Sequence, residues 1–257
     1  MKNDLSACVV VPCYNESARW NHKAYENYLS GGPDRIQLFF VDDGSNDATY
    51  ANIELLTAKY PSKCSSLRLD ANVGKAGAVR AGALMALKQK ADFIGYWDAD
   101  LSTPLEEIER FLEFAQNHQE ALIIMGSRVK LHGSTKIIRN EFRHYIGRII
   151  ATFISKILRL SVYDTQCGAK LIRSDNAEEV FKEVFLSKWL FDVEILLRIL
   201  ERQGYREIEE KIFEFPIKRW EDRGDSKVSW TYLFKLPIDL IKLRMTYAQV
   251  RRQSTRL

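Results

Sequence analysis

The strongest constraint on the fold is the alternation of short apolar runs with helical patterns through the first half of the chain. The runs ACVVVPCY, IQLFFV, SLRL, DFIGYW and ALIIMG are separated by segments with helical periodicity. Strands that alternate with helices of about 10 to 15 residues favour a mostly parallel sheet with right-handed crossovers. The sequence therefore predicts an α/β fold with helices flanking the sheet.

Each of the first four predicted strands is followed by residues suited to binding a ligand. The segments at these positions are VPCYNE, VDDGSND, NVGKAGAV and YWDADLSTP. In parallel α/β sheets, ligands bind beyond the carboxyl ends of the strands. We therefore expect one ligand site at this edge of the sheet.

Asp98 and Asp100 form the most informative of these segments. Side chains at i and i+2 of an extended segment share a face, so both carboxylates can point at one ligand. Proteins commonly hold Mg²⁺ or Mn²⁺ with one or two carboxylates plus substrate phosphates. The alternative is simple helix capping, and Ser102 or Thr103 is expected to cap the next helix, with Pro104 opening it.

Two further loops fit a nucleotide diphosphate. An acid after the second strand, at Asp42 or Asp43, can accept hydrogen bonds from a base or ribose. Lys75 and Arg80 lie at a glycine-containing helix start, where a diphosphate can bind. Both loops are alternatively ordinary turns between strand and helix, with Ser45 or Asn46 capping the helix that follows.

Together, in this order and spacing, these segments resemble the inverting GT-A glycosyltransferases of family 2, and the resemblance covers about residues 7 to 230. It implies a GT-A (Rossmann-like) fold with Mg²⁺ or Mn²⁺ as cofactor. It also implies that Asp98 faces the ribose and diphosphate, and that Asp100 is the principal metal ligand beside Asp98. The nucleotide would be surrounded by Pro12, Tyr14, Glu16, Asp42 and Asp43, with Lys75 at the diphosphate.

The second half resembles the polyprenyl-phosphate hexosyltransferases in the segments MGSRVK, RNEFR, YDTQCGAKLI, WLFDVEILLR and DSKV. This implies transfer of a hexose from a UDP-hexose or GDP-hexose to a polyprenyl or dolichyl phosphate, with UDP-glucose as the first choice. Two departures from the family pattern stand out. LSTP stands where mannose synthases tend to have a Gln two residues after the second Asp, which leaves the donor open. The segment near Gly147 lacks the family's usual Ser, which removes one candidate contact to the acceptor phosphate.

Arginines offer a site for the acceptor phosphate. Arg128, Arg139 and Arg143 can form a cationic pocket, because guanidinium groups bind phosphate through paired hydrogen bonds. A lipid phosphate, with a second pKa of about 6, is already an anionic nucleophile at neutral pH. Asp192 and Asp164 are therefore candidates for either a base or a positioning residue. For each acid the alternative is a helix cap or an ion pair.

Two of the four cations in the polar segment KRWEDRGDSKV, Arg223 and Lys227, are further candidates for phosphate binding. By the resemblance, Arg223 and Lys227 bind phosphate charge when this segment folds over the donor. Without the resemblance, the segment reads equally well as a solvated loop.

The end of the chain is basic. Residues 227 to 257 hold seven Lys or Arg against Asp239, whereas the whole chain carries only +4, so the rest sums to −2. Mixed with Trp, Tyr and aliphatic residues, these cations favour a membrane surface over nucleic acid. We expect a catalytic domain over residues 1–227 and a basic amphipathic membrane-surface tail over 228–257. Residues 146–158 form a second amphipathic pattern, which fits equally a helix packed on the sheet and an interfacial helix near the lipid acceptor.

The four cysteines form no CxxC pair, which fits a reducing compartment. The run Leu5–Asn15 is too short to span a bilayer, and the N-terminus leaves no room for a signal peptide. The expected location is cytoplasmic, peripheral on the cytoplasmic face of a membrane.

Three rival functions stay open at this point. A related GT-A transferase could use a glycan, a diacylglycerol or a protein as acceptor, which would require a stronger base at Asp192. A nucleotidyltransferase also uses acids on an α/β sheet, but its Gly-rich basic loop is absent where VPCYNE stands. A non-catalytic membrane-binding module is supported only by the tail and the amphipathic helix.

Overall fold

The computed structural model describes residues 4–129, 136–138, 154–155, 158, 160, 162–204, 208–221 and 230–248. One sheet has seven strands in the order β3-β2-β1-β4-β7-β5-β8. The strands are β1 (Ala7–Cys13), β2 (Ile36–Asp42), β3 (Cys64–Arg68), β4 (Phe93–Trp97), β5 (Ile123–Ser127), β7 (Ala169–Arg173) and β8 (Ile212–Pro216). All neighbours run parallel except at β7, which is antiparallel to both β4 and β5. The predicted mostly parallel sheet is confirmed.

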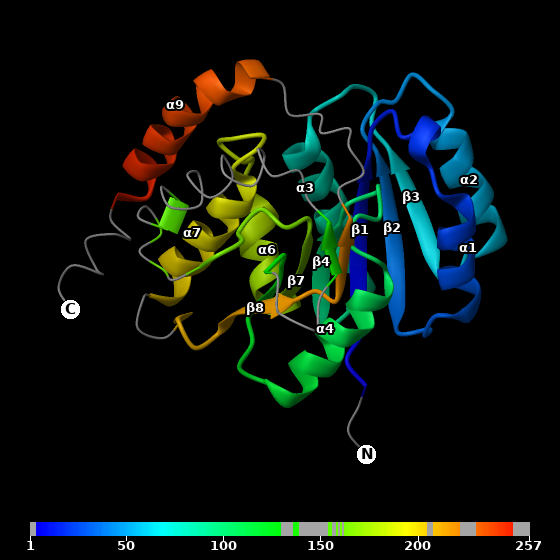
Figure 1. Cartoon of the computed structure of the whole chain (residues 1–257), viewed down its shortest axis with the longest axis horizontal. Helices are drawn as coiled ribbons and strands as arrows, with labels where there is room; N and C mark the ends of the chain where they lie inside the picture. The colour runs from blue at the N-terminus through cyan, green and yellow to red at the C-terminus, as the bar shows by residue number, and fades with distance from the viewer. Residues whose placement is uncertain are drawn as a thin grey trace.

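Helices cover both faces of this sheet (Figure 1). Along β2, Leu38 and Phe40 face one helical layer, while Phe39 and Val41 face the other. A strand buried on both faces must be apolar throughout, which explains the run IQLFFV. One layer holds α1 (His22–Gly31), α2 (Thr49–Lys59) and α4 (Glu106–Asn117); the other holds α3 (Lys75–Ala86), α6 (Ser174–Lys182), α7 (Phe191–Gln203) and α9 (Trp230–Thr246).

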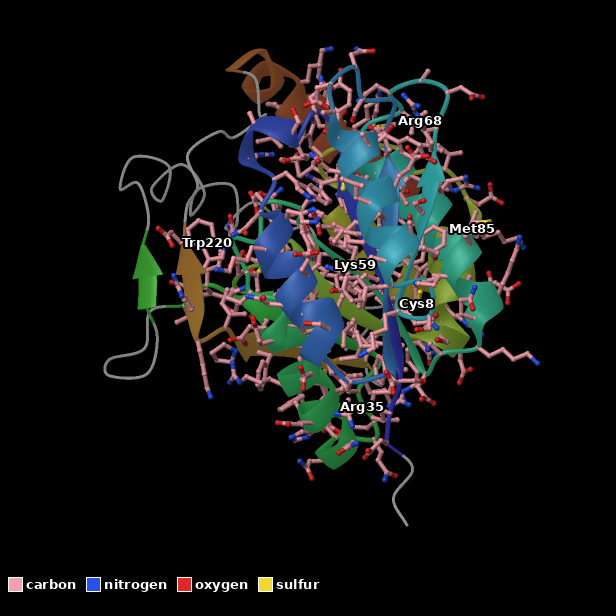
Figure 2. All side chains as sticks on the ribbon, turned by 90° about the vertical axis from the view of Figure 1, so that its right-hand side faces the viewer. Cys8, Arg35, Lys59, Arg68, Met85 and Trp220 are labelled. Carbon is pink, nitrogen blue, oxygen red and sulfur yellow. The ribbon has the colours of Figure 1, made fainter. Side chains whose placement is uncertain are left out.

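A second, two-stranded sheet pairs β6 (Lys136–Ile138) with β9 (Arg219–Glu221) in parallel. Figure 2 shows Trp220 on β9, beside β6. Because the backbone N–H of Glu221 donates to the Ser102 carbonyl at 3.2 Å, β9 lies beside the loop that follows β4, at the carboxyl edge of the large sheet.

The predicted cap of the helix after Asp100 is wrong. Helix α4 begins at Glu106, two residues beyond Pro104, and neither Ser102 nor Thr103 caps it. The backbone N–H of Ser102 instead donates to the Asp100 carboxylate at 2.9 Å. The chain therefore completes a turn around Asp100 before the helix starts.

The predicted cap of the helix after β2 is also wrong. Helix α2 begins at Thr49, and the carboxylate that accepts from the backbone N–H of Thr49, at 2.9 Å, belongs to Asp47 rather than to Ser45 or Asn46. Ser45 Oγ accepts a hydrogen bond from the backbone N–H of Asn15 at 2.9 Å, and the N–H of Asn46 donates to Asn15 Oδ1 at 2.9 Å. Both residues therefore connect the β2 loop to the β1 loop, which positions the ligand edge of the sheet.

Helix α9 has a buried side and an exposed side. Leu243 of α9 and Tyr247, which directly follows the helix, are buried in the core, where the Tyr247 hydroxyl donates to Glu194 of α7. Ile238, Ile241 and Met245 are each more than half exposed. Figure 1 shows α9 lying along the outside of the molecule. The exposed side of this helix therefore carries apolar side chains.

Most of the predicted amphipathic helix 146–158 lies outside the described residues. Two members of its apolar stripe, Ile154 and Leu158, are described and both are buried in the core. Within the described parts of the chain, every helix is too short or too polar to cross a bilayer.

Candidate active site

The loops after β1 and β2 meet at the carboxyl edge of the sheet. The backbone N–H of Asp43 donates to the Cys13 carbonyl at 2.8 Å, and that of Glu16 donates to Thr49 Oγ1 at 2.7 Å. Glu16 is buried and forms an ion pair with Arg19. These contacts bring together the predicted nucleotide residues Pro12, Tyr14, Glu16, Asp42 and Asp43.

Asp42 presents a buried carboxylate oxygen at this edge. Its Oδ1 accepts from the backbone N–H of Ser45 at 3.3 Å, but its Oδ2 is buried without a hydrogen bond. The nearest cation is the Arg68 guanidinium, 3.4 Å from Oδ2 and stacked 4.6 Å from the centroid of the Tyr50 ring. Arg68 lies at the end of β3 (Figure 2). Asp42 Oδ2 is thus balanced by the charge of Arg68 but lacks a hydrogen bond, which an N–H or O–H group of a ligand could supply.

Asp43 shapes the start of helix α3. Its two oxygens accept from the backbone N–H groups of Val73 and Gly74 at 2.8 and 2.9 Å. Gly74 has a φ of +86°, a conformation that favours glycine. Burial raises the pKa of Asp43, partly offset by these hydrogen bonds. A diphosphate at this helix start would therefore rely on Lys75 and the amides that Asp43 leaves available.

Asp98 and Asp100 lie close enough for their charges to interact. Burial, followed by the charge of Asp98, raises the pKa of Asp100. Leu101 has a φ of +54°, and the Tyr25 hydroxyl donates to the Ala99 carbonyl at 2.9 Å, so the loop is held in a tight turn. Two neighbouring carboxylates with one raised pKa form a site that favours a cation.

Gly168 makes room for Asp98. The backbone N–H of Asp98 donates to the Gly168 carbonyl at 2.9 Å. A Cβ on Gly168 would lie 1.8 Å from Asp98 Oδ2. The turn before β7 therefore approaches the carboxylate as closely as only glycine permits.

Lys75 connects the α3 start to Asp98, since its Nζ lies 2.5 Å from Asp98 Oδ1. Burial would lower the pKa of Lys75, but the carboxylates of Asp98 and Asp192 raise it above its usual value. Arg80, the other cation of the motif, instead donates to the Lys182 carbonyl. Lys75 is thus the member of this pair that faces the acids.

Asp192, at the start of α7, is held by side chains from the strands β4 and β7. Its Oδ1 accepts from Lys170 Nζ at 2.6 Å and from the Tyr96 hydroxyl. Glu194, two residues on, is buried in a separate pairing with Arg198 at 2.7 Å. Only Asp192 of the two acids in this motif lies on the side of Lys75.

Arg128 and Asp164 form a bidentate pair. Arg128 Nε and Nη2 lie 2.7 Å from the two oxygens of Asp164, whose backbone N–H donates to Glu214. Burial alone would raise the pKa of Asp164, but Arg128 holds it below its usual value. The Arg128 guanidinium also lies 5.3 Å from the centroid of the Trp220 ring. An acid held ionised in this way is a weak proton acceptor.

Four predicted phosphate-binding residues, Arg139, Arg143, Arg223 and Lys227, lie outside the described residues. Their placement beside Arg128 or the donor site stays a prediction.

Sequence reasoning missed three residues of this region. Lys170 lies in the strand AKLI, where one charged residue among apolar ones was the available signal. Tyr96 shares a strand face with Asp98. Lys188 precedes α7, its side chain lies against Gly74, and its charge acts on Asp43. No local pattern connects Lys188 to the loop it contacts.

Comparison with known proteins agrees with this arrangement. Residues 8–181 match the family described as glycosyl transferase family 2. A dolichyl-phosphate beta-glucosyltransferase of Trichomonas vaginalis is 31% identical over 255 residues, which is 95% of this chain and 72% of that protein. The dolichyl-phosphate beta-glucosyltransferase of Mus musculus is 31% identical over 251 residues, covering 93% and 75% of the two chains.

Solved structures share the fold. Glucosyl-3-phosphoglycerate synthase from Mycobacterium tuberculosis, in complex with UDP, superposes with a TM-score of 0.66 at 15% identity, covering 96% of this chain and 81% of that chain. A complex of the same enzyme with Mn²⁺, UDP and glucosyl-3-phosphoglycerate gives 0.64 at 14% identity, with the same coverage. The likeness confirms the predicted GT-A (Rossmann-like) fold. Since the family match spans more than half of the chain, this protein belongs to glycosyl transferase family 2 and is a glycosyltransferase.

Proposed function

We propose that this enzyme transfers a hexose with inversion from a nucleotide sugar to a polyprenyl or dolichyl phosphate, with UDP-glucose as the first donor to test. The observation that carries the proposal is the meeting of Asp42, Asp43, Lys75 and Asp98 at one sheet edge. The named activity of relatives that match 91–96% of this chain supports the acceptor class.

The donor would bind along this edge. Asp42 offers its unsatisfied oxygen to the base or ribose, while Lys75 faces the diphosphate. Asp98 and Asp100 fit Mg²⁺ or Mn²⁺, because both offer oxygen ligands and because burial, followed by the charge of Asp98, raises the pKa of Asp100 when no cation is bound. Among the residues that the structure describes, no third acid, His or Cys joins them, so substrate phosphates would complete the coordination. A bound metal would stabilise the departing nucleoside diphosphate.

The acceptor phosphate would approach from the side of Arg128. Two N–H groups of this guanidinium are engaged by Asp164, which fixes its plane and leaves its remaining donors for a phosphate. We propose that Arg139, Arg143, Arg223 and Lys227 add further cationic contacts. The phosphate is its own nucleophile, so the chain's part is orientation and charge balance rather than proton removal.

The enzyme would work at a membrane surface, with residues 1–227 as catalytic domain and 228–257 as its basic membrane-facing tail. Exposed Ile238, Ile241 and Met245 on α9 alternate with exposed Lys242 and Arg244. Apolar side chains beside cations suit the headgroup layer of an anionic bilayer. We propose peripheral binding to the cytoplasmic face.

The test is direct. Purified enzyme is incubated with Mg²⁺, a phosphorylated prenol and, separately, UDP- and GDP-hexoses, and both nucleoside diphosphate release and the mass of the lipid product are measured. A prenyl-phosphate hexose from one donor is the expected result. Turnover only with a glycan, diacylglycerol or protein acceptor would contradict the lipid-phosphate proposal and favour the rival in which Asp192 is a base.

A further inference from the structure

A fully buried lysine lies beneath the site. The side chain of Lys170 has no exposed surface, and its Nζ donates to the Cys167 carbonyl and to Asp192 Oδ1, each at 2.6 Å. Burying an ammonium group is costly unless it is paired and hydrogen-bonded. The cost of burying Lys170 therefore suggests a role for its ionic partner, Asp192.

Tyr96 is a second donor to the same oxygen. Tyr96 and Lys170 are direct partners across the antiparallel pairing of β4 with β7, and both hydrogen-bond to Asp192 Oδ1. Lys170 Nζ also lies 5.2 Å from the centroid of the Tyr96 ring. Two rigid strands thus fix one oxygen of a carboxylate that belongs to a helix.

The other oxygen of Asp192 is left for a ligand. Within the described ranges no donor to Oδ2 is recorded, and the side chain keeps 7% of its surface exposed. Asp192 is near enough to Lys75 for its charge to act on that ammonium group, which in turn contacts Asp98. Tyr96 and Asp98 share a strand face, so Asp192 and the donor site lie on the same side of the sheet.

The chemistry of this oxygen selects its partner. An ionised carboxylate only accepts hydrogen bonds, and it repels a phosphate. If the acceptor is a phosphate, which is where this inference rests on the proposed function, no base is needed beside it. The nucleotide sugar carries neutral donors on its base, its ribose and its sugar. Because Asp42 is the acid proposed to meet the base or ribose, the donors left for Asp192 are the hydroxyl groups of the sugar.

We propose that Asp192 accepts a hydrogen bond from a hydroxyl of the transferred hexose. Lys170 and Tyr96 are positioning residues, which hold Oδ1 so that Oδ2 faces the sugar. Asp192 is then a determinant of sugar specificity, and its contribution appears only when the sugar is attached to the nucleotide.

Calorimetric titration of each variant with UDP and with UDP-glucose, both with Mg²⁺, tests this without any acceptor. If the wild-type protein prefers guanine nucleotides, GDP and its hexose conjugate replace them. Asp192→Asn and Lys170→Met should weaken binding of the nucleotide sugar by about tenfold, since a hydrogen bond to a charged group is lost or misdirected. Tyr96→Phe should weaken it by about threefold, and all three should leave binding of the free diphosphate within about twofold.

Tyr247→Phe is the matched control, because it removes another buried tyrosine hydroxyl that donates to an acid of the same helix, Glu194. It should change neither affinity. In the Asp192→Asn background, Lys170→Met should cause no further loss for the sugar nucleotide, because the carboxylate that it positions is gone.

An equal loss for both ligands would overturn the proposal in favour of a structural role, and so would an unchanged sugar contribution in Asp192→Asn. If Lys170→Met does not fold, Tyr96→Phe against Tyr247→Phe decides the positioning role. A wild-type enzyme that forms no lipid product but shows the expected pattern would overturn the proposed acceptor and leave the sugar contact standing.

Discussion

Two parts of the site hold acids in opposite electrostatic conditions. The first is the carboxyl edge of the sheet with Asp98 and Asp100, called the donor edge, and the second is the pair of Arg128 and Asp164, called the Arg128 region. At the donor edge, burial and then the charge of Asp98 raise the pKa of Asp100. In the other region, burial would raise the pKa of Asp164, but the bidentate contact with Arg128 lowers it. Asp164 has Arg128 as a bidentate partner, whereas the cation at the donor edge, Lys75, contacts Asp98. We expect the donor edge to take a further cation together with the substrate, and Asp164 to hold Arg128 in place.

The largest expected effect is at Asp100. Asp100→Asn should lower kcat/KM by about a thousandfold, because the site loses a carboxylate that fits the metal and the leaving group loses its stabilisation. Steady-state kinetics over a range of Mg²⁺ concentrations measure this. Asp34→Asn, which changes an acid that is 95% exposed, is the control and should leave kcat/KM unaltered. Activity close to wild type in Asp100→Asn would remove the proposed difference between the two regions.

Gly168→Ala should cause the next largest loss of activity. The added methyl would lie 1.8 Å from Asp98 Oδ2, so Asp98 must move. A displacement of about 1 Å at the reacting groups can cost about a hundredfold in rate. Gly31→Ala, where nothing lies within 4 Å of the new methyl, should have no effect on kinetics. Equal rates in the two variants would show that the position of Asp98 is unimportant.

The donor edge was open to sequence reasoning because each motif lies within one strand-loop-helix unit. VDDGSND and YWDADLSTP each follow an apolar strand directly, and parallel strands bring their carboxyl ends together. That rule placed Asp42, Asp43, Lys75 and Asp98 in one region. The finer roles of these residues remain predictions.

The parts of the site that the sequence did not predict depend on contacts between segments far apart in the chain. Asp43 accepts hydrogen bonds from the backbone N–H groups of Val73 and Gly74, about 30 positions later in the chain. The pairing of Lys170 with Asp192 depends on the antiparallel register of β7. Neither periodicity nor propensity encodes such a register. The cap predicted at Ser45 or Asn46 failed for the same reason, since both residues bond across to the β1 loop rather than along their own segment.

The third expected difference between the two regions is in the free energy of unfolding, measured without metal or substrate. Asp164→Asn should lower the free energy of unfolding at neutral pH by about 2 kcal/mol, because Arg128 loses its partner. A lowered carboxyl pKa stabilises the fold above the carboxyl's usual range, and the contribution is lost as pH falls below about 4. Asp100 has a raised pKa, so its ionised form destabilises the metal-free protein, and Asp100→Asn should stabilise it slightly at neutral pH. Urea unfolding at pH 7 and pH 3.5 tests both signs; a loss of stability in both variants would contradict the comparison.

The smallest expected effect concerns what lies beyond Arg128. If the acceptor side is completed by a bilayer, Ile241→Glu should weaken partition of the protein onto vesicles containing anionic lipid by about tenfold, because it replaces an apolar contact with a charge repelled by that surface. Leu55→Glu, a similar change at a 63% exposed position on α2, should weaken partition far less. Co-sedimentation at two salt concentrations separates apolar from electrostatic contributions, since the latter are screened. An equal loss of vesicle binding in the two variants would mean that the change in net charge alone causes it. Helix α9 would then not be the membrane-binding surface.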